Sequence, residues 1–178
     1  LELYKKLSGE GYIVANELTS AKLSPEQFEL GYPWTSRNLG VISGHFGKVA
    51  QALTAIGARQ GNKDKLDVIE FGAGWGELAI PLAKSGQMVT CVDIDEGFVA
   101  RLHRIASREG CEVATITGDF VAAAESIDSR SFDCAIFQSS FHHCLEFSRL
   151  LSAIKTNVLN ENGAIFFLAE PIFRNYPF

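Results

Sequence analysis

Short apolar runs alternate with segments of helical periodicity between residues 66 and 170 of the chain. The apolar runs are rich in β-branched residues and lack a polar face, which is typical of strands buried in a parallel sheet. They lie at residues 66–69, 88–92, 112–117, 131–138 and 164–170. Helices are predicted between them, at residues 77–83, 96–108, from about 121, and at 146–159. This alternation predicts an α/β fold with a doubly wound, mostly parallel sheet.

The part of the chain before the first predicted strand has a different pattern. Apolar residues at helical spacing predict a helix over residues 39–56, and a polar connector, residues 57–64, leads into the first strand. We expect residues 1–65 to form an N-terminal helical extension of the core at residues 66–178, with both parts in one compact unit. The polar segment 160–163 ends in glycine, which predicts a turn and helix cap before the last strand.

Composition and charge narrow the class of protein. The 178 residues can form one globular domain with a core, and no apolar run is long enough to span a bilayer. The formal net charge is −5 and Lys and Arg do not cluster, which disfavours nucleic acid as a partner. Cys91 and Cys134 fall in predicted strands, and Cys111 and Cys144 show no Cys-x-x-Cys spacing. This usage is typical of the reducing cytoplasm rather than of a disulfide framework.

A glycine-rich turn at residues 70–76, with the sequence EFGAGWG, follows the first predicted strand. Glycine allows the backbone to adopt positive φ and to approach a ligand closely. A strand, a glycine turn and a helix in succession predict a site for a nucleotide-like ligand at the helix N-terminus. The spacing is G-x-G-x-G and not the dinucleotide pattern G-x-G-x-x-G, and Glu77 occupies the place of the last dinucleotide glycine. Its negative charge disfavours a pyrophosphate there.

The acidic residue before the first glycine and the G-x-G-x-G turn together resemble motif I of the class I S-adenosylmethionine-dependent methyltransferases. The resemblance implies the Rossmann-like methyltransferase fold and S-adenosylmethionine as cofactor, with S-adenosylhomocysteine as product. It assigns cofactor contacts to Glu70, Gly72, Ala73, Gly74 and Gly76. This ligand carries a cationic sulfonium and no phosphate, so acidic groups nearby are compatible with it.

Two acidic residues after the next predicted strands extend the resemblance. Asp93 ends the second strand, about 20 residues past the glycines, where one carboxylate can accept hydrogen bonds from both ribose hydroxyls. Ile94 follows it in the same cofactor segment, and Asp95 is expected to cap the next helix. After the third strand, the resemblance assigns Asp119 to the adenine amino group and Phe120 to the adenine ring. Asp119 also suits the cap of the following helix, and both roles can hold together.

The segment after the fourth predicted strand has the sequence QSSFHH, residues 138–143. The resemblance places it beside the transferable methyl group and assigns Gln138 to the cofactor. It lacks the Asn/Asp-Pro-Pro-Tyr/Phe pattern of amino methyltransferases acting on nucleobases or protein side chains, and instead resembles small-molecule methyltransferases. His142 and His143 are candidate catalytic residues, since histidine can act as a general base near neutral pH; capping or packing is the alternative role. No metal site is expected, because no further Cys or His lies at ligand spacing.

The chain after the fifth predicted strand is short. The family sheet normally continues with a helix and two more strands, and only residues 171–178 remain here. We therefore expect a sheet truncated after strand five, as in a fragment of a longer protein or in a naturally shortened variant. The resemblance implies a methyltransferase acting on an unidentified small molecule at O, N or C. The alternatives are a non-catalytic cofactor-binding module of a larger protein and another nucleoside-using enzyme, such as an aminopropyl transferase.

Overall fold

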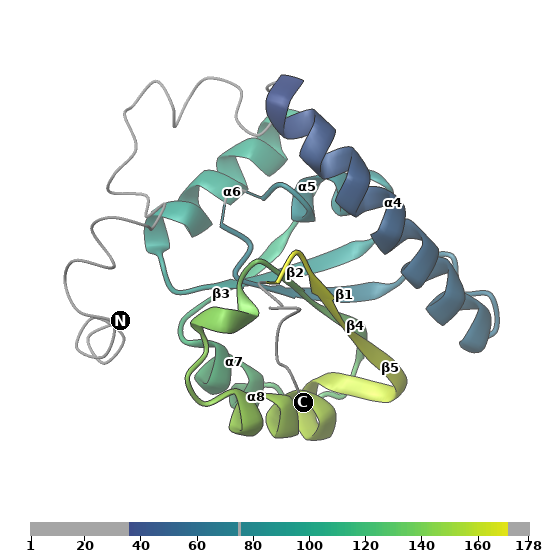
Figure 1. The fold of residues 1–178 in the computed structure, drawn as a ribbon, viewed down its shortest axis with the longest axis vertical. Helices are drawn as coiled ribbons and strands as arrows, with labels where there is room; N and C mark the ends of the chain where they lie inside the picture. The colour runs from purple at the N-terminus through teal and green to yellow at the C-terminus, as the bar shows by residue number, and fades with distance from the viewer. Residues whose placement is uncertain (1–35, 75, 171–178) are drawn as a thin grey trace, which may run out of the picture.

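A five-stranded sheet forms the centre of the computed structural model, which describes residues 36–74 and 76–170 except for the side chains of residues 36–39 and 41 (Figure 1). The strand order is β3-β2-β1-β4-β5, and each neighbouring pair is parallel. The strands are β1 Asp67–Phe71, β2 Met88–Asp93, β3 Ala114–Thr117, β4 Phe132–Gln138 and β5 Leu159–Leu168. This confirms the doubly wound, parallel sheet predicted from the sequence. The order reverses between β1 and β4, the point at which such sheets bind ligands.

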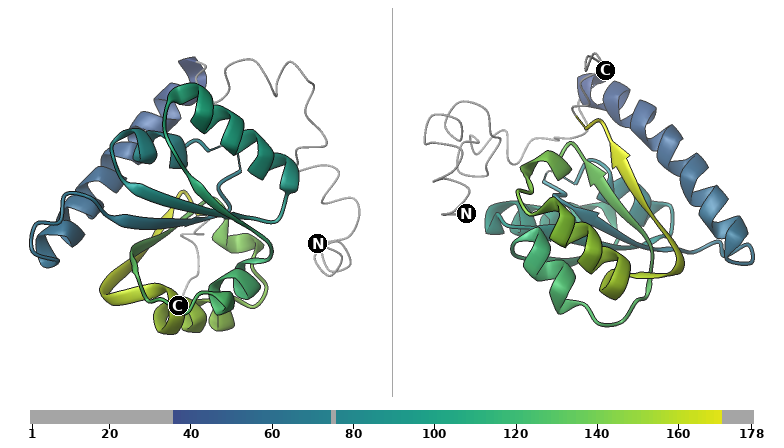
Figure 2. Two further views of the ribbon diagram at one scale, coloured as in Figure 1. Left: turned by 180° about the vertical axis from the view of Figure 1, so that it is seen from behind. Right: turned by 60° about the horizontal axis from the view of Figure 1, so that its bottom comes forward.

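Helices cover both faces of the sheet (Figure 2). On one face lie α4 Ser36–Arg59, α5 Ala79–Lys84 and α6 Glu96–Glu109, and on the other lie α7 Phe120–Ser126 and α8 Phe147–Ala153 (Figures 1 and 2). A short 3₁₀ helix, η2 Phe141–His143, follows β4, and α8 continues directly into a π-helical turn, η3 Ile154–Val158. The loops after β1, β2, β3 and β4 therefore meet at one edge of the sheet.

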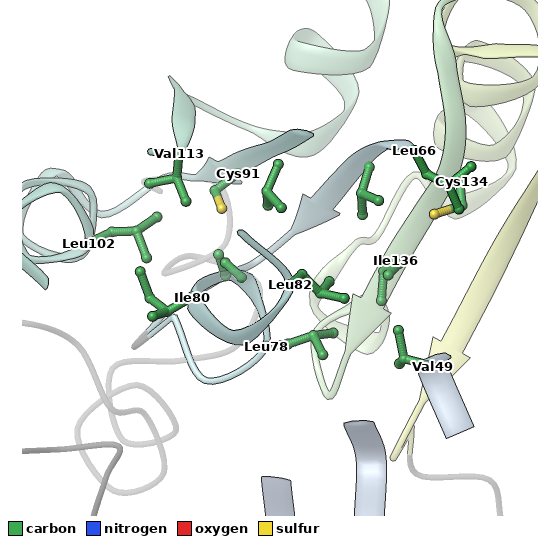
Figure 3. Close-up of a cluster of buried hydrophobic side chains, with 14 of the residues drawn as sticks. Val49, Leu66, Leu78, Ile80, Leu82, Cys91, Leu102, Val113, Cys134 and Ile136 are labelled. Carbon is green, nitrogen blue, oxygen red and sulfur yellow. The ribbon is translucent and has the colours of Figure 1, made fainter. Parts of the chain in front are cut away.

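Two apolar cores lie on the two faces because successive strand residues point in opposite directions. In β1, the fully buried Val68 belongs to the core beneath α5 and α6, and the fully buried Ile69 belongs to the core beneath α7 and α8. Figure 3 shows the first core, in which Leu102 of α6 and Ile136 of β4 share one cluster with Val49 of α4. The long helix α4 is thus part of the packed core.

The segment that joins α8 to β5 differs from its prediction. The helix expected over residues 146–159 consists of α8 and η3 and ends at Val158. The turn and cap expected at residues 160–163 are wrong, because these residues belong to β5. Their polar, glycine-ended sequence is that of a turn, but here it forms an irregular strand. Phe132 of β4 pairs with Leu159 and Cys134 pairs with Ala164, so the extra residues of β5 bulge between these pairs.

A buried carboxylate anchors this irregular strand at the amino end of the sheet. Asp133 is fully buried, and its oxygens accept hydrogen bonds from Lys63 Nζ at 2.8 Å and from the Asp67 backbone N–H at 2.7 Å. The Asn160 side-chain amide donates to the same carboxylate at 2.8 Å. Hydrogen bonds to Asp133 and then to Asp67 raise the pKa of Lys63, so Lys63 stays charged. The network fixes β5 against β4 at the edge opposite the glycine turn.

Several expectations concern residues outside the described part. The N-terminal extension expected at residues 1–65 is described only from residue 36 onward, where it forms α4. Trp75 of the glycine turn lies outside the described residues, as does the segment 171–178 on which the expected truncation depends. α4 itself is longer than the helix predicted over residues 39–56 and takes in the first part of the expected connector.

Candidate functional site

The glycine turn joins β1 to α5 and requires glycine for two separate reasons. Gly72, Gly74 and Gly76 have φ values of 79°, 46° and 75°, a region that side chains disfavour. The Gly72 N–H donates to the Val92 carbonyl at 2.7 Å, which draws the turn against the end of β2. A Cβ atom on Gly72 would lie 2.6 Å from Cβ of Ser140, whereas one on Gly74 would have no neighbour within 4 Å among the described residues. The turn is therefore packed at Gly72 and open at Gly74.

Asp93, at the end of β2, holds this turn through its carboxylate. Oδ2 accepts from the Gly74 backbone N–H at 2.9 Å, and Oδ1 accepts from the Asp95 N–H at 2.9 Å. Burial raises the pKa of Asp93, and the backbone hydrogen bonds from Asp95 and Gly74 oppose that rise. A carboxylate has about four acceptor positions, so two bonds leave capacity for further donors. Asp95 caps α6 as predicted, accepting from the N–H groups of Gly97 and Phe98.

Glu70 lies beneath the same turn in the centre of the sheet. It pairs with Cys91 of β2 and Ile136 of β4, and it is only 2 % exposed. Burial, followed by the charges of Asp93 and Glu77, raises the pKa of Glu70 to about 8. The carboxyl group is therefore mostly protonated at neutral pH. Its Oε2 atom is buried and has no hydrogen-bond partner among the described residues.

Gln138, the last residue of β4, presents a second buried oxygen without a partner among the described residues. Its Oε1 atom forms no hydrogen bond within the described part of the chain. Buried polar atoms are nearly always hydrogen-bonded, and an exception calls for an unseen partner. β4 lies beside β1, so Gln138, the last residue of β4, and Glu70, the last residue but one of β1, lie on neighbouring strands at the point where the strand order reverses. Two such oxygens suit a ligand that brings hydrogen-bonding groups of its own.

Asp119 and Phe120 follow β3 at the same edge. Asp119 caps α7, as its alternative role predicts: Oδ1 accepts from the Val121 N–H at 2.9 Å and from the Ala122 N–H at 3.2 Å. The Asp119 side chain is exposed, and both bonds use the same oxygen, so the cap leaves its other oxygen for a ligand. The Phe120 ring lies edge-on to Phe71, with ring centroids 5.8 Å apart. The Phe120 side chain is half-buried, so part of its surface remains accessible.

The segment after β4 is held tightly against β1 and β5. Ser139 adopts a φ of 51°, and the Ser140 hydroxyl donates to the Phe71 carbonyl at 2.6 Å. Glu170, just beyond β5, accepts hydrogen bonds from the N–H groups of Ser140 and Phe141 at 2.8 and 2.9 Å. His142 is partly exposed, and its Nδ1 lies 2.9 Å from Oε2 of Glu170. The rings of His142 and His143 contact each other, with centroids 4.1 Å apart.

The structure thus gathers the residues singled out from the sequence at the carboxyl ends of four adjacent strands. They are Glu70, Gly72, Ala73, Gly74 and Gly76 around the end of β1, Asp93 and Ile94 around the end of β2, Asp119 and Phe120 after β3, Gln138 at the end of β4, and His142 and His143 in η2. Ala73 differs from the rest, because its side chain is 7 % exposed and belongs to the apolar core.

One prominent residue of the site, Glu170, was not predicted. Its carboxylate joins the loop after β4 to the end of β5. The available signal was a strand ending in an acidic residue, the same signal that identified Glu70 and Asp93. Among the described residues, no cluster of three or more His, Cys, Asp and Glu side chains could hold a metal ion. None of the helices described here has the length and apolar character needed to cross a membrane.

Comparison with known proteins identifies the family. Residues 68–163, more than half of the chain, match the methyltransferase domain family. The chain belongs to this family. The matched region contains the glycine turn, Asp93, Asp119 and His142, and it ends before Glu170.

Relatives and solved structures agree with this assignment. A protein of Geobacillus sp. (strain WCH70), named as a candidate methyltransferase, is 36% identical over 114 residues, which are 61% of this chain and 43% of the relative. The crystal structure of PH0226 from Pyrococcus horikoshii OT3 superposes with a TM-score of 0.61 at 21% identity, over 75% of this chain and 59% of that one. The crystal structure of a candidate sarcosine dimethylglycine methyltransferase from Galdieria sulphuraria superposes with a TM-score of 0.57 at 17% identity, over 69% of this chain and 43% of that one. At these identities the structures show the fold alone. The chain spans less than half of the length of its curated relatives.

Proposed function

We propose that this methyltransferase domain binds S-adenosylmethionine at the carboxyl ends of β1 to β4 and transfers its methyl group to a small molecule. The observation that carries the proposal is the pair of buried oxygens without a partner among the described residues, Oε2 of Glu70 and Oε1 of Gln138, on the neighbouring strands β1 and β4. S-adenosylmethionine carries an ammonium group, an adenine amino group and two ribose hydroxyls, all of which donate hydrogen bonds. These donors complement the acceptor oxygens of Gln138, Asp93 and Asp119.

In this proposal each acidic residue binds a different part of the cofactor. Asp93 holds the ribose hydroxyls with the acceptor capacity that Gly74 and Asp95 leave free. Asp119 accepts from the adenine amino group through the oxygen that does not cap α7, and Phe120 packs against the purine. The open backbone at Gly74 leaves space for close approach of the ligand. Gln138 supplies a further acceptor, and the protonated carboxyl group of Glu70 can donate a hydrogen bond as well as accept one.

The loop after β4 borders the place where the methyl acceptor binds in this proposal. When bound, the sulfonium of the cofactor supplies an activated methyl group, and holding the methyl acceptor in line with it accounts for much of the catalysis. His142 is partly exposed at this edge, and we assign it the proton that an O–H or N–H acceptor loses. A net charge of −5 and the absence of a Lys/Arg cluster in the sequence favour a small molecule over nucleic acid.

Calorimetry with three ligands tests the proposed cofactor. We expect S-adenosylmethionine and S-adenosylhomocysteine to bind more tightly than NAD, because Glu77 sits where a pyrophosphate would have to dock. Tighter binding of NAD would contradict the proposal. Binding of S-adenosylhomocysteine together with transfer to no acceptor would instead favour a non-catalytic binding module.

Replacing Asp93 by asparagine should weaken the binding of S-adenosylhomocysteine by roughly 1–3 kcal/mol. The amide keeps one acceptor oxygen, for which the ribose hydroxyls and the N–H groups of Gly74 and Asp95 then compete. The melting temperature should fall as well, since the carboxylate also holds the turn. Calorimetry gives the affinity, and Asp128→Asn in the exposed loop after α7 is the matched control. Unchanged affinity in Asp93→Asn would show that other groups hold the ribose.

A further inference from the structure

The carboxylate of Glu170 accepts hydrogen bonds from the turn that carries His142, through the backbone N–H groups of three successive residues. Oε1 accepts from the backbone N–H groups of Ser140 at 2.8 Å and Phe141 at 2.9 Å. Oε2 lies 3.3 Å from the backbone N of His142 and 2.9 Å from Nδ1 of its ring. The Glu170 side chain is 8 % exposed, so these contacts are largely shielded from water. One side chain thus fixes both the turn and the imidazole.

The charge of Glu170 follows from its partners. Burial alone would raise the pKa of Glu170, but the hydrogen bonds from the His142 ring and from the three backbone N–H groups outweigh burial and lower it. The carboxylate is therefore ionised at neutral pH. An ionised carboxylate only accepts hydrogen bonds, so the close contact with Nδ1 of His142 requires a hydrogen on Nδ1.

The position of this hydrogen decides what the rest of the ring can do. Neutral imidazole carries one hydrogen, so a hydrogen on Nδ1 leaves Nε2 with its lone pair. Nε2 then points away from the carboxylate, on a side chain that is 33 % exposed. Without such a partner a histidine ring is free to carry its hydrogen on Nε2, which would leave no base on the outer side.

We propose that Glu170 is a positioning residue that holds His142 as the Nδ1–H tautomer and so directs the Nε2 lone pair toward the methyl acceptor. This inference rests on the proposed function, in which His142 takes the acceptor's proton. The three backbone bonds alone would make Glu170 a cap of η2; the short contact to Nδ1 is the observation that goes beyond a cap. Glu170 touches neither cofactor nor acceptor in this role and acts through His142.

Nuclear magnetic resonance of the wild-type chain tests the tautomer without any ligand. Long-range ¹H–¹⁵N correlation spectra distinguish protonated from unprotonated ring nitrogens, and the His142→Asn spectrum assigns the signals of His142. At a pH where the ring is neutral we expect Nδ1 to be protonated and Nε2 to be unprotonated. The opposite assignment in the wild type would overturn the proposal, whatever a variant does.

Glu170→Gln provides the second measurement. The amide oxygen should stay on the N–H groups of Ser140 and Phe141, which places the amide NH₂ beside Nδ1 of His142. An NH₂ group donates to Nδ1, so we expect the hydrogen of His142 to move to Nε2. Glu161→Gln makes the same chemical change at an exposed position of β5 and should leave His142 as in the wild type. An unchanged tautomer in folded Glu170→Gln would contradict the role of Glu170.

Calorimetry with S-adenosylhomocysteine on the same samples separates this inference from the proposed function. If the tautomer changes in Glu170→Gln as expected but the wild type binds no S-adenosylhomocysteine, the proposed function fails and the control of His142 by Glu170 stands. If the ligand binds but wild-type His142 carries its hydrogen on Nε2, the inference fails and the cofactor assignment stands.

Discussion

Replacing His142 by alanine should lower the rate of methyl transfer by about 10²–10⁴-fold, the usual contribution of a general base. The affinity for S-adenosylhomocysteine should not change, because the proposed cofactor contacts come from other residues. The structure places His142 at the carboxyl edge of the sheet with Nδ1 held by Glu170, so the loss should fall on the proton-transfer step. The measurement is transfer of radiolabelled methyl groups to the acceptor that the wild type uses, in the full-length protein.

A control variant limits the interpretation of this result. His103→Ala removes an exposed histidine of α6 that contacts Thr115, and it should retain the wild-type rate. Full activity in both His142→Ala and His143→Ala would show that the histidines are structural and that catalysis rests on proximity.

The strands and their ends were predictable because the signals are local. Four of the five apolar runs end close to an acidic residue or a glycine, the run of β4 being the exception. The predicted and observed ends of β2 agree, with Asp93 as its last residue. The caps Asp95 and Asp119 were predictable for the same reason, since an N-cap depends only on the next three residues. The parallel sheet then brings the strand ends to one edge without further information.

What could not be predicted depends on contacts between distant segments. The contact of Glu170 with the His142 ring spans 28 residues, and no local pattern in the sequence marks it. The polar segment after η3 has the composition of a turn, but the buried Asp133 carboxylate accepts from Asn160 and draws this segment into β5. In both cases the outcome depends on a side chain that is distant in the sequence, which a local sequence pattern cannot indicate.

Glu70 should make the stability of the domain depend strongly on pH. An unfolded chain loses this proton near the ordinary value of 4.5, whereas burial raises the folded pKa to about 8. Between these values the folded state binds more protons than the unfolded state, so its stability falls as the pH rises. The contribution is complete below the unfolded pKa and is lost once the pH passes the folded one. From about pH 5.5 to about pH 8.5 the expected loss is roughly 3 kcal/mol.

The difference between wild type and Glu70→Gln isolates this contribution from those of other groups, among them Asp93, whose pKa burial also raises. Denaturant unfolding across this range gives the free energy of unfolding of each protein. Glu70→Gln should match the wild type most closely in acid, where Glu70 is protonated, and should exceed it increasingly as the pH rises. Glu112→Gln, at an exposed position before β3, should follow the wild type throughout. Parallel pH profiles of wild type and Glu70→Gln would show that Glu70 ionises in the folded protein as readily as in the unfolded chain.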